Sequence, residues 1–266
     1  MTKISFIGTG KMATALISYI YKSGLAESII ATNKDENALK KIKSRFKEIE
    51  TTTSNAEAAK NSGILFICVK PQDMDIVLHE IKNEIKNQLI VSIAAGIKIR
   101  HIESILGKKR VMRVMPNINC LVGEMAAGFS AGKYATKADI ETVKTLLNCA
   151  GMAYFVNEDL LDAVTAVSGS GPAFFAYLID AIAKESIKKG LKKNIAYSLA
   201  AKTALGTGKL MLDKKLSAEE VISMVASKKG TTEAGLSILN KNKAAEILAK
   251  AVDAAYKRSK ELGKLI

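Results

Sequence analysis

Residues 3–24 predict a strand, a glycine turn and a helix in immediate succession. A short apolar run at 3–7 is followed at once by GTGKMA, from Gly8 to Ala13, and apolar residues then recur at helical spacing up to Gly24. In the spacing G-x-G-x-x-A the first glycine makes a tight turn, the second lets the backbone approach a pyrophosphate, and the small third residue lets helix pack on strand. The segment therefore predicts dinucleotide binding; a strand-to-helix turn with a purely structural role is the alternative.

The alternation of strands and helices continues through the first half of the chain. The run ILFICV at 64–69 is apolar throughout, as in a strand buried on both faces. Further strands are expected at 28–31, 49–51, 88–95, 111–115, 126–130 and 153–156, and helices at 35–46, 56–61 and 137–149. This pattern is typical of an α/β domain with a doubly wound parallel sheet.

The end of the second predicted strand bears on the choice of dinucleotide. An NAD-specific fold usually places an acid there to hold the ribose hydroxyls. This chain has Thr32, Asn33 and Lys34 instead, which offer an amide and a cation to a 2′-phosphate. We therefore expect NADPH to be preferred, although Asp35 follows closely and an exposed lysine is common by chance.

Two other strand ends are candidates for the nicotinamide side of the site. The carboxyl ends of central strands in an open α/β sheet lie at the cofactor crevice. The strand at 64–69 stops at Lys70-Pro71, and the strand at 88–95 ends at Gly96, where backbone can approach a ligand. A proline that merely terminates its strand is the alternative for Pro71.

At AVSGSGPAFFAY, residues 166–177, the pattern changes to helices only. Ser170 or Gly171 can cap a helix that begins at Pro172, and Ser217 with Glu220 predicts a capping box. After a helix at 158–167, helices are expected at 172–190, at 195–212 with Asn194 as its cap, at 218–226, from 233 onward and at 244–262. We predict a dinucleotide-binding domain at 1–157 and an all-α domain at 158–266, whose apolar helices need a second copy as partner.

The composition of the chain indicates whether it binds nucleic acid, a membrane or a metal ion. A net charge of +14 suggests phosphate binding, but the lysines are scattered, tryptophan is absent and aromatic residues make up only 5%. We therefore expect solvated lysine-rich helix faces and no nucleic acid. No long uninterrupted apolar run and no charged leader is present, so a cytoplasmic protein without a membrane span is expected. Three cysteines and two histidines lack metal-ligand spacing, and we predict neither a metal site nor a disulfide framework.

Six motifs together resemble the pyrroline-5-carboxylate reductase family. They are FIGTGKMA, VKPQ, SIAAG, RVMPN, DAVTAVSGSGPAF and SKKGTTEAGL, and they span nearly the whole chain. The glycine fingerprint alone fits many dehydrogenases, whereas the SGSGPA hinge followed by the GTT segment is much more specific. The resemblance implies a Rossmann domain followed by a helical dimerisation domain, often assembled as a pentamer of dimers. It also implies reduction of a cyclic imine to L-proline by hydride transfer from NADPH or NADH.

The resemblance also implies site residues, position by position. The cofactor side would comprise Ile7, Gly8, Thr9, Gly10, Lys11, Met12, Asn33, Lys34, Asn55, Val69, Lys70, Pro71, Ala94, Ala95 and Gly96. The substrate side would comprise Glu158, Ser168, Gly169, Ser170, Gly171, Pro172, Gly230, Thr231 and Thr232, with Thr232 as the catalytic candidate. Family members often read SPGGTT where this chain has Lys228 and Lys229, so the loop's backbone and its effect on the substrate are open.

Two other interpretations stay open at this point. Another reductase of the imine or β-hydroxyacid type would share the domain order and would commit a lysine or aspartate to proton transfer, for which Lys184 is the nearest candidate. A dinucleotide-sensing or nucleic-acid-binding regulator is the non-enzyme alternative. Neither the assembly beyond a dimer nor feedback by proline follows from the sequence.

Overall fold

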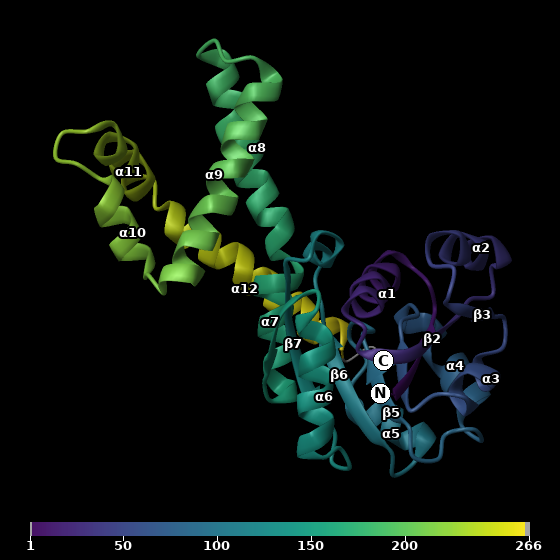
Figure 1. Ribbon diagram of the computed structural model, residues 1–266. Coiled ribbons are helices and arrows are strands. Elements are labelled where there is room, and N and C mark those ends of the chain that lie inside the picture. The colour runs from purple at the N-terminus through teal and green to yellow at the C-terminus, as the bar shows by residue number, and fades with distance from the viewer. Residues whose placement is uncertain (1, 264–266) are drawn as a thin grey trace. The chain divides into compact units, whose positions relative to one another are not determined.

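A computed structural model describes residues 2–263 (Figure 1). The chain forms two compact units. The first comprises residues up to Gly169 together with the chain from Ala255 onward, and the second comprises Ser170–Ala254. Residues 158–169 thus belong to the first unit by their contacts, whereas the sequence prediction grouped them with the helical domain.

The first unit is built on one eight-stranded sheet with the order β3-β2-β1-β4-β5-β6-β7-β8. Its strands are β1 (Thr2–Ile7), β2 (Ala26–Thr32), β3 (Glu50–Thr52), β4 (Ile64–Ile67), β5 (Leu89–Ser92), β6 (Arg110–Met115), β7 (Met125–Ala131) and β8 (Gly151–Phe155). The first six are parallel, in the strand order of a dinucleotide-binding domain. The predicted Rossmann-type sheet is confirmed for these strands.

The last two strands run in the opposite direction, so the prediction of a wholly parallel sheet is wrong for them. β7 pairs antiparallel with β6, and β8 pairs parallel with β7. The chain between β6 and β7 is short and consists largely of the 3-10 helix Ile118–Val122. A parallel neighbour needs a crossover of about a dozen or more residues, so this connection can only return the chain as an antiparallel strand.

Six α-helices connect the strands of this unit. They are α1 (Lys11–Ser23), α2 (Glu36–Arg45), α3 (Asn55–Lys60), α4 (Met74–Ile81), α5 (Ile99–Leu106) and α6 (Lys137–Asn148). The predicted helix at 56–61 is confirmed as α3, which is capped by Ser54, whose hydroxyl accepts the Glu57 N–H. The sequence yielded no predicted element for α4 or α5, each of which is eight residues long.

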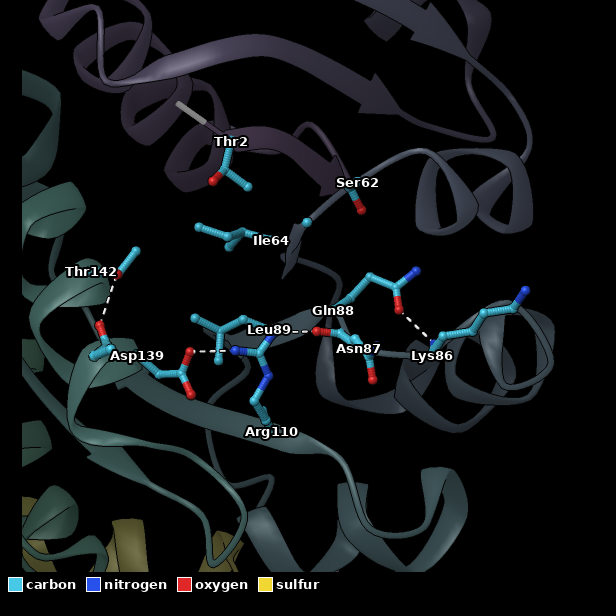
Figure 2. A pocket seen from close by; sticks show the side chains of 12 residues that line it. Thr2, Ser62, Ile64, Lys86, Asn87, Gln88, Leu89, Arg110, Asp139 and Thr142 are labelled. Atoms are coloured by element: carbon cyan, nitrogen blue, oxygen red, sulfur yellow. Dashed lines mark hydrogen bonds and ion pairs between the residues drawn. The ribbon is translucent and has the colours of Figure 1, made fainter.

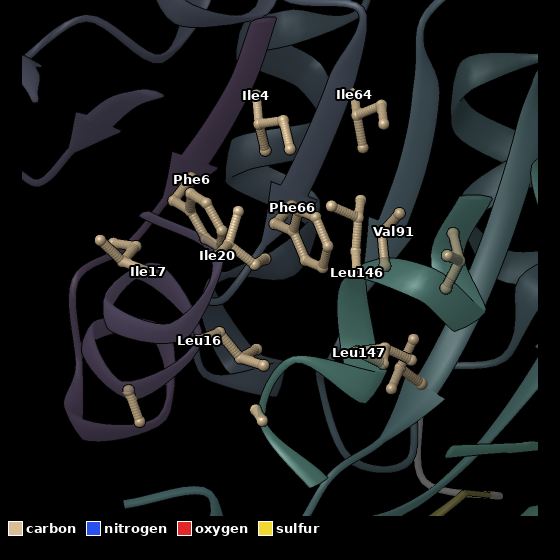
Figure 3. Close-up of a cluster of buried hydrophobic side chains, with 14 of the residues drawn as sticks. Ile4, Phe6, Leu16, Ile17, Ile20, Ile64, Phe66, Val91, Leu146 and Leu147 are labelled. Atoms are coloured by element: carbon tan, nitrogen blue, oxygen red, sulfur yellow. The ribbon is translucent and has the colours of Figure 1, made fainter. Parts of the chain in front are cut away.

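Both faces of the sheet are covered by buried apolar side chains. Along β4, Phe66 packs into one cluster, with residues of α1, α2 and α6, whereas Leu65 and Ile67 pack into the other, with residues of α3, α4 and α5. Figure 3 shows the first cluster, in which the Phe6 and Phe66 rings stack with centroids 4.7 Å apart. This burial on both faces explains why the central strands are continuously apolar.

The second unit contains only helices, as predicted. They are α8 (Gly171–Lys188), α9 (Lys193–Lys214), α10 (Ala218–Val225), α11 (Thr231–Lys241) and most of α12 (Ala244–Leu262), which ends in the first unit. The capping box of Ser217 and Glu220 is confirmed. The prediction of Asn194 as a cap is wrong: Lys192 is the N-cap of α9 in extended conformation, and Asn194 already lies inside the helix.

The segment before α8 is helical but irregular. The 3-10 helix Glu158–Leu160 passes into α7 (Leu161–Val164), and a π-helix follows at Thr165–Gly169. Ser170 occupies the predicted N-cap position of α8, in helical conformation. Its side chain makes no capping hydrogen bond. By length and mean hydropathy the helical stretch Glu158–Lys188 could cross a membrane, but only by those two criteria.

Large apolar side chains of the second unit are exposed. α8 and α9 pack through the small residues Ala183, Ala196 and Ala200, with little else buried between them. The exposed set includes Phe175, Tyr177, Ile182, Leu199, Leu205, Leu212, Met224, Val225, Ile238 and Ile247. So much exposed apolar surface marks an interaction face rather than a solvated surface.

Candidate active site

The glycine turn after β1 has the geometry that a phosphate-binding turn requires. Gly8 has φ +91°, and its N–H donates to the Thr32 carbonyl at 2.9 Å. A Cβ on Gly8 would lie 2.9 Å from the Cys68 carbonyl oxygen and 3.2 Å from Val69 Cγ1. Only glycine fits here, because both the backbone conformation and the space exclude a side chain.

Gly10, unlike Gly8, has an ordinary backbone conformation and open space around it. It is the N-cap of α1, with φ −67° and ψ 179°, and a Cβ added to it would meet no atom within 4 Å. Neither conformation nor crowding in the chain itself therefore calls for glycine at this position. The open space lies at the N-terminus of α1, beside the exposed Lys11, where free N–H groups and the helix dipole suit an anion. These residues fit a dinucleotide pyrophosphate.

Polar side chains join the ends of β1 and β2. The Asn33 amide donates to Thr9 Oγ1 at 2.7 Å, while its oxygen accepts the Asp35 N–H at 2.9 Å. Asn55 accepts from Thr32 Oγ1 at 2.5 Å, which ties the start of α3 to the same strand end. No acidic side chain occupies the first positions after β2, and Lys34 is exposed beside them.

The other predicted cofactor residues lie at the carboxyl ends of β4 and β5. Because β1, β4 and β5 are parallel neighbours, these ends share the edge that carries Gly8. Lys70 is extended and leads into the 3-10 helix Pro71–Asp73. Beyond β5, Ala94 is buried, Ala95 is exposed and Gly96 has φ +80°. The structure thus brings all the predicted cofactor segments to one edge of the first unit.

Glu158 lies in the first unit and contacts two groups of the chain itself. Its Oε1 accepts the backbone N–H of Ile99 at 2.8 Å and an N–H of Arg113 at 3.1 Å. Ile99 is the first residue of α5, and Arg113 is a buried residue of β6. The role of Glu158 in substrate binding remains a prediction.

The SGSGPA segment crosses from one unit to the other. In the first unit, the Ser168 hydroxyl donates to the Ala126 carbonyl, and the Ser168 carbonyl accepts from Asn117 Nδ2 at 3.2 Å. Asn117 is buried and also accepts the Ala126 N–H at 3.1 Å. At Gly169 an added Cβ would lie 2.9 Å from Met115 Cε, the end of a flexible side chain that would have to shift. The remaining four residues, Ser170, Gly171, Pro172 and Ala173, begin the second unit at the start of α8.

Arg113 and Asn117 were not among the predicted site residues. Both are polar positions in the apolar run RVMRVMPN, and both are buried. A buried polar side chain must be paired, so a polar residue within such a run was the available signal. Their partners lie too far along the chain to be deduced from spacing.

The predicted carboxylate site lies in the second unit, at the N-terminus of α11. Gly230 is the N-cap, and Thr231 and Thr232 form the first turn, whose N–H groups have no acceptor within the helix. Lys229 takes a left-handed conformation, φ +60°, and its N–H donates to the Glu233 carboxylate. A lysine at this φ costs about 1 kcal/mol that a glycine would not. The loop therefore keeps a turn suited to glycine although Lys229 occupies it.

One hollow in the first unit is not at the predicted site. It measures about 540 Å³ and lies at the amino-terminal edge of the sheet, beside Thr2, Ile64, Leu89 and Arg110 (Figure 2). Some of the polar groups drawn there are paired with the chain itself: Arg110 donates to Asp139 Oδ1 at 2.8 Å, and the Thr142 hydroxyl donates to the Ala138 carbonyl at 2.8 Å. A smaller hollow of about 290 Å³ lies next to Gly96 and is lined by Gly96, Lys98, Arg100, His101, Ser104 and Gly263.

The thiols of Cys68 and Cys120 are poor nucleophiles. Burial raises the pKa of the Cys68 thiol far above its usual range and that of Cys120 to about 11. Both are therefore neutral near pH 7, and the thiolate is the reactive form. Within residues 2–263 no group of three or more His, Cys, Asp or Glu side chains is placed to hold a metal ion.

Comparison with known proteins decides the family. Residues 158–262 match the family model described as pyrroline-5-carboxylate reductase dimerisation, and residues 3–96 match that of NADP oxidoreductase, coenzyme F420-dependent. The chain is 41% identical to a pyrroline-5-carboxylate reductase of Methanosarcina acetivorans over 266 residues, 98% of each chain. The chain belongs to the pyrroline-5-carboxylate reductase family.

Solved structures of pyrroline-5-carboxylate reductases agree over the same length. The enzyme from Coxiella burnetii has a TM-score of 0.94 at 30% identity, with 98% of both chains covered. The enzyme from Plasmodium falciparum, solved with NADP bound, has a TM-score of 0.86 at 27% identity and the same coverage. The predicted fold and family are both confirmed.

The chain is thus an NAD(P)H-dependent pyrroline-5-carboxylate reductase, which performs the final step of proline biosynthesis. Its helical dimerisation region implies a homodimer and accounts for the exposed apolar side chains of α8 to α12. Family membership excludes the two alternative interpretations of the sequence, a dinucleotide-sensing or nucleic-acid-binding regulator and another imine or β-hydroxyacid reductase. Lys184, the proton donor that another reductase would need, is paired with Asp180 at 2.7 Å, and this hydrogen bond raises the pKa of Lys184.

Proposed function

We propose that this reductase uses NADPH in preference to NADH. The observation that carries the proposal is the end of β2, where Asn33 and Lys34 stand in place of an acid. Asn33 is oriented by Thr9 and by the Asp35 N–H, and Lys34 is exposed next to it. A 2′-phosphate would be attracted by the lysine, whereas the ribose hydroxyls of NADH would lack a carboxylate partner.

The preference can be measured as the ratio of kcat/KM for NADPH and NADH with the same imine. We expect a ratio of about ten or more, and a fall of about tenfold in that ratio for Lys34→Glu, because the new carboxylate repels the 2′-phosphate. Lys40→Glu, an equal charge change on an exposed lysine of α2, is the control. A clear NADH preference in the unaltered enzyme contradicts the proposal.

The substrate carboxylate is proposed to bind at the start of α11. Pyrroline-5-carboxylate carries a carboxylate, and the N-terminal N–H groups of a helix bind such anions. Gly230 brings no side chain to this turn, and Thr231 and Thr232 add two hydroxyls to its N–H groups. Lys228 and Lys229 add positive potential close by, which favours an anionic substrate and changes KM more than substrate identity.

The chemistry demands little of the protein. A bound reduced nicotinamide supplies the hydride that the C=N carbon of the five-membered ring accepts. Because the imine can bind already protonated, no side chain has to deliver a proton before reduction, which agrees with the scarcity of histidine and the neutral thiols of Cys68 and Cys120. The residues of this chain would act mainly by positioning: the first turn of α11 holds the carboxylate, and Thr232 hydrogen-bonds to the ring nitrogen or the carboxylate.

NADPH oxidation followed by absorbance, with the cyclic imine as substrate, tests this function directly. We expect oxidation to depend on the imine. Oxidation that does not respond to the imine, in a preparation that binds NADPH, contradicts the proposed site chemistry.

We infer further that dimers of this enzyme assemble into a pentamer of dimers in the cytoplasm. The support is the extent of apolar surface on the helices of the second unit, together with the family's frequent decameric assembly. Light scattering coupled to size exclusion should give ten times the 28.5-kDa chain mass. A mass of twice the chain would limit the assembly to the dimer, and a monomer would contradict the interface itself.

A further inference from the structure

The N-terminus of α5 is capped by a residue far away in the sequence. The local N-cap, Lys98, provides no side-chain hydrogen bond. Glu158 provides it instead: its Oε1 accepts the Ile99 N–H at 2.8 Å across 59 positions of the chain. A carboxylate at a helix N-terminus satisfies an N–H that has no acceptor within the helix and interacts favourably with the dipole.

Arg113 fixes the position of this carboxylate. Its guanidinium is 3.1 Å from the same Glu158 oxygen, and the residue is only 6% exposed. On β6 it lies opposite Ser92, the last residue of β5. A buried arginine without its carboxylate would be left as an uncompensated charge, so the pair has one strongly favoured arrangement.

Two hydrogen bonds hold the two ends of the loop between β5 and α5. At its start, the Ala94 N–H donates to Ser92 Oγ at 3.3 Å, and at its end Ile99 is bonded to Glu158. The middle of the loop, Ala94 to Gly96, is the segment assigned above to the nicotinamide side, and Gly96 has φ +80°. Movement of Ile99 would therefore move these residues.

We propose that Glu158, held by Arg113, is a positioning residue that fixes the Ala94 to Gly96 loop for the nicotinamide end of the cofactor. The inference rests on the proposed cofactor site. It gives Glu158 a role through the protein, in place of the substrate contact that the family resemblance implied.

Three variants of the full-length enzyme test this role. Glu158→Ala removes the acceptor, Glu158→Gln keeps an oxygen for the Ile99 N–H, and Asp159→Asn changes the exposed neighbouring acid as a control. The readouts are amide hydrogen exchange at residues 94–99, NADPH affinity by fluorescence titration without imine, and kcat and KM for both substrates.

For Glu158→Ala we expect faster exchange at Ile99 and through the loop, NADPH affinity weakened about tenfold, and kcat lowered by a similar factor, because small misplacements of reacting groups are costly. KM for the imine should stay within about twofold of the unaltered enzyme. Glu158→Gln should recover most of the protection and NADPH affinity, and Asp159→Asn should match the unaltered enzyme.

The contrary results are equally distinct. A rise in KM for the imine with unchanged NADPH affinity and unchanged exchange would make Glu158 a substrate contact and overturn the inference. Lower thermal stability alone, with affinity and kcat per folded molecule unchanged, would also overturn it. If the unaltered enzyme bound no NADPH, the proposed cofactor site would fail, and the exchange data would still report whether Glu158 holds the loop.

Discussion

Replacing Gly8 by alanine is expected to lower the free energy of unfolding by about 3 kcal/mol and to weaken NADPH binding by about tenfold or more. Gly8 has φ +91°, and the new Cβ would lie 2.9 Å from the Cys68 carbonyl oxygen, which is backbone and cannot rotate away. To relieve this clash, the carboxyl ends of β1 and β4 would have to move apart. Denaturant unfolding measures the loss of stability, and fluorescence titration measures NADPH affinity.

Gly10→Ala is the matched control within the same turn. Gly10 has φ −67° and ψ 179°, and its added Cβ meets nothing within 4 Å, so the free energy of unfolding should change by less than about 0.5 kcal/mol. NADPH binding should nevertheless weaken, because the methyl group would occupy the space proposed for the pyrophosphate. Unchanged NADPH affinity in Gly10→Ala would place the cofactor elsewhere, whatever the outcome for Gly8.

Replacing Thr232 by alanine is expected to lower kcat/KM for the imine by about tenfold to a hundredfold. A hydrogen bond to a charged group contributes about 1.5–3 kcal/mol, and the proposed partner is either the protonated ring nitrogen or the carboxylate. Steady-state kinetics at saturating NADPH measures the effect. NADPH affinity should not change, since the cofactor residues are assigned to other segments.

Thr232→Ser separates the hydroxyl from the methyl group of this side chain. The serine variant should retain most of the activity if the hydroxyl is the functional group. Equal losses in both variants would indicate that the methyl group or the helix start is what matters. An unchanged kcat/KM in Thr232→Ala would remove Thr232 from the active site.

Much of the fold is readable from local pattern. The fingerprint at Gly8 to Ala13 predicts the turn and the start of α1, and the apolar run at 64–69 predicts a central strand. The capping box of Ser217 and Glu220 is also confirmed. Each of these signals joins residues a few positions apart, where backbone geometry alone determines which groups can meet.

The reversal of β7 was not readable in the same way. A strand's apolar pattern does not state its direction, which follows from the connection that precedes it. The connection after β6 contains a 3-10 helix, whose compactness is evident only in three dimensions.

The sequence by itself determined the family and the two kinds of domain, because these depend on residue types at fixed short spacings; the cofactor residues that it predicts rest on the same kind of signal. Only the tertiary structure decided the partners of the buried polar side chains: Glu158 with Ile99 and Arg113, and Asn117 with Ser168. These contacts join residues 45 to 59 positions apart, and sheet order and crossovers determine which of them meet. The physical reason is that an unpaired polar group is costly when buried, so each must find a partner, but periodicity does not identify which one.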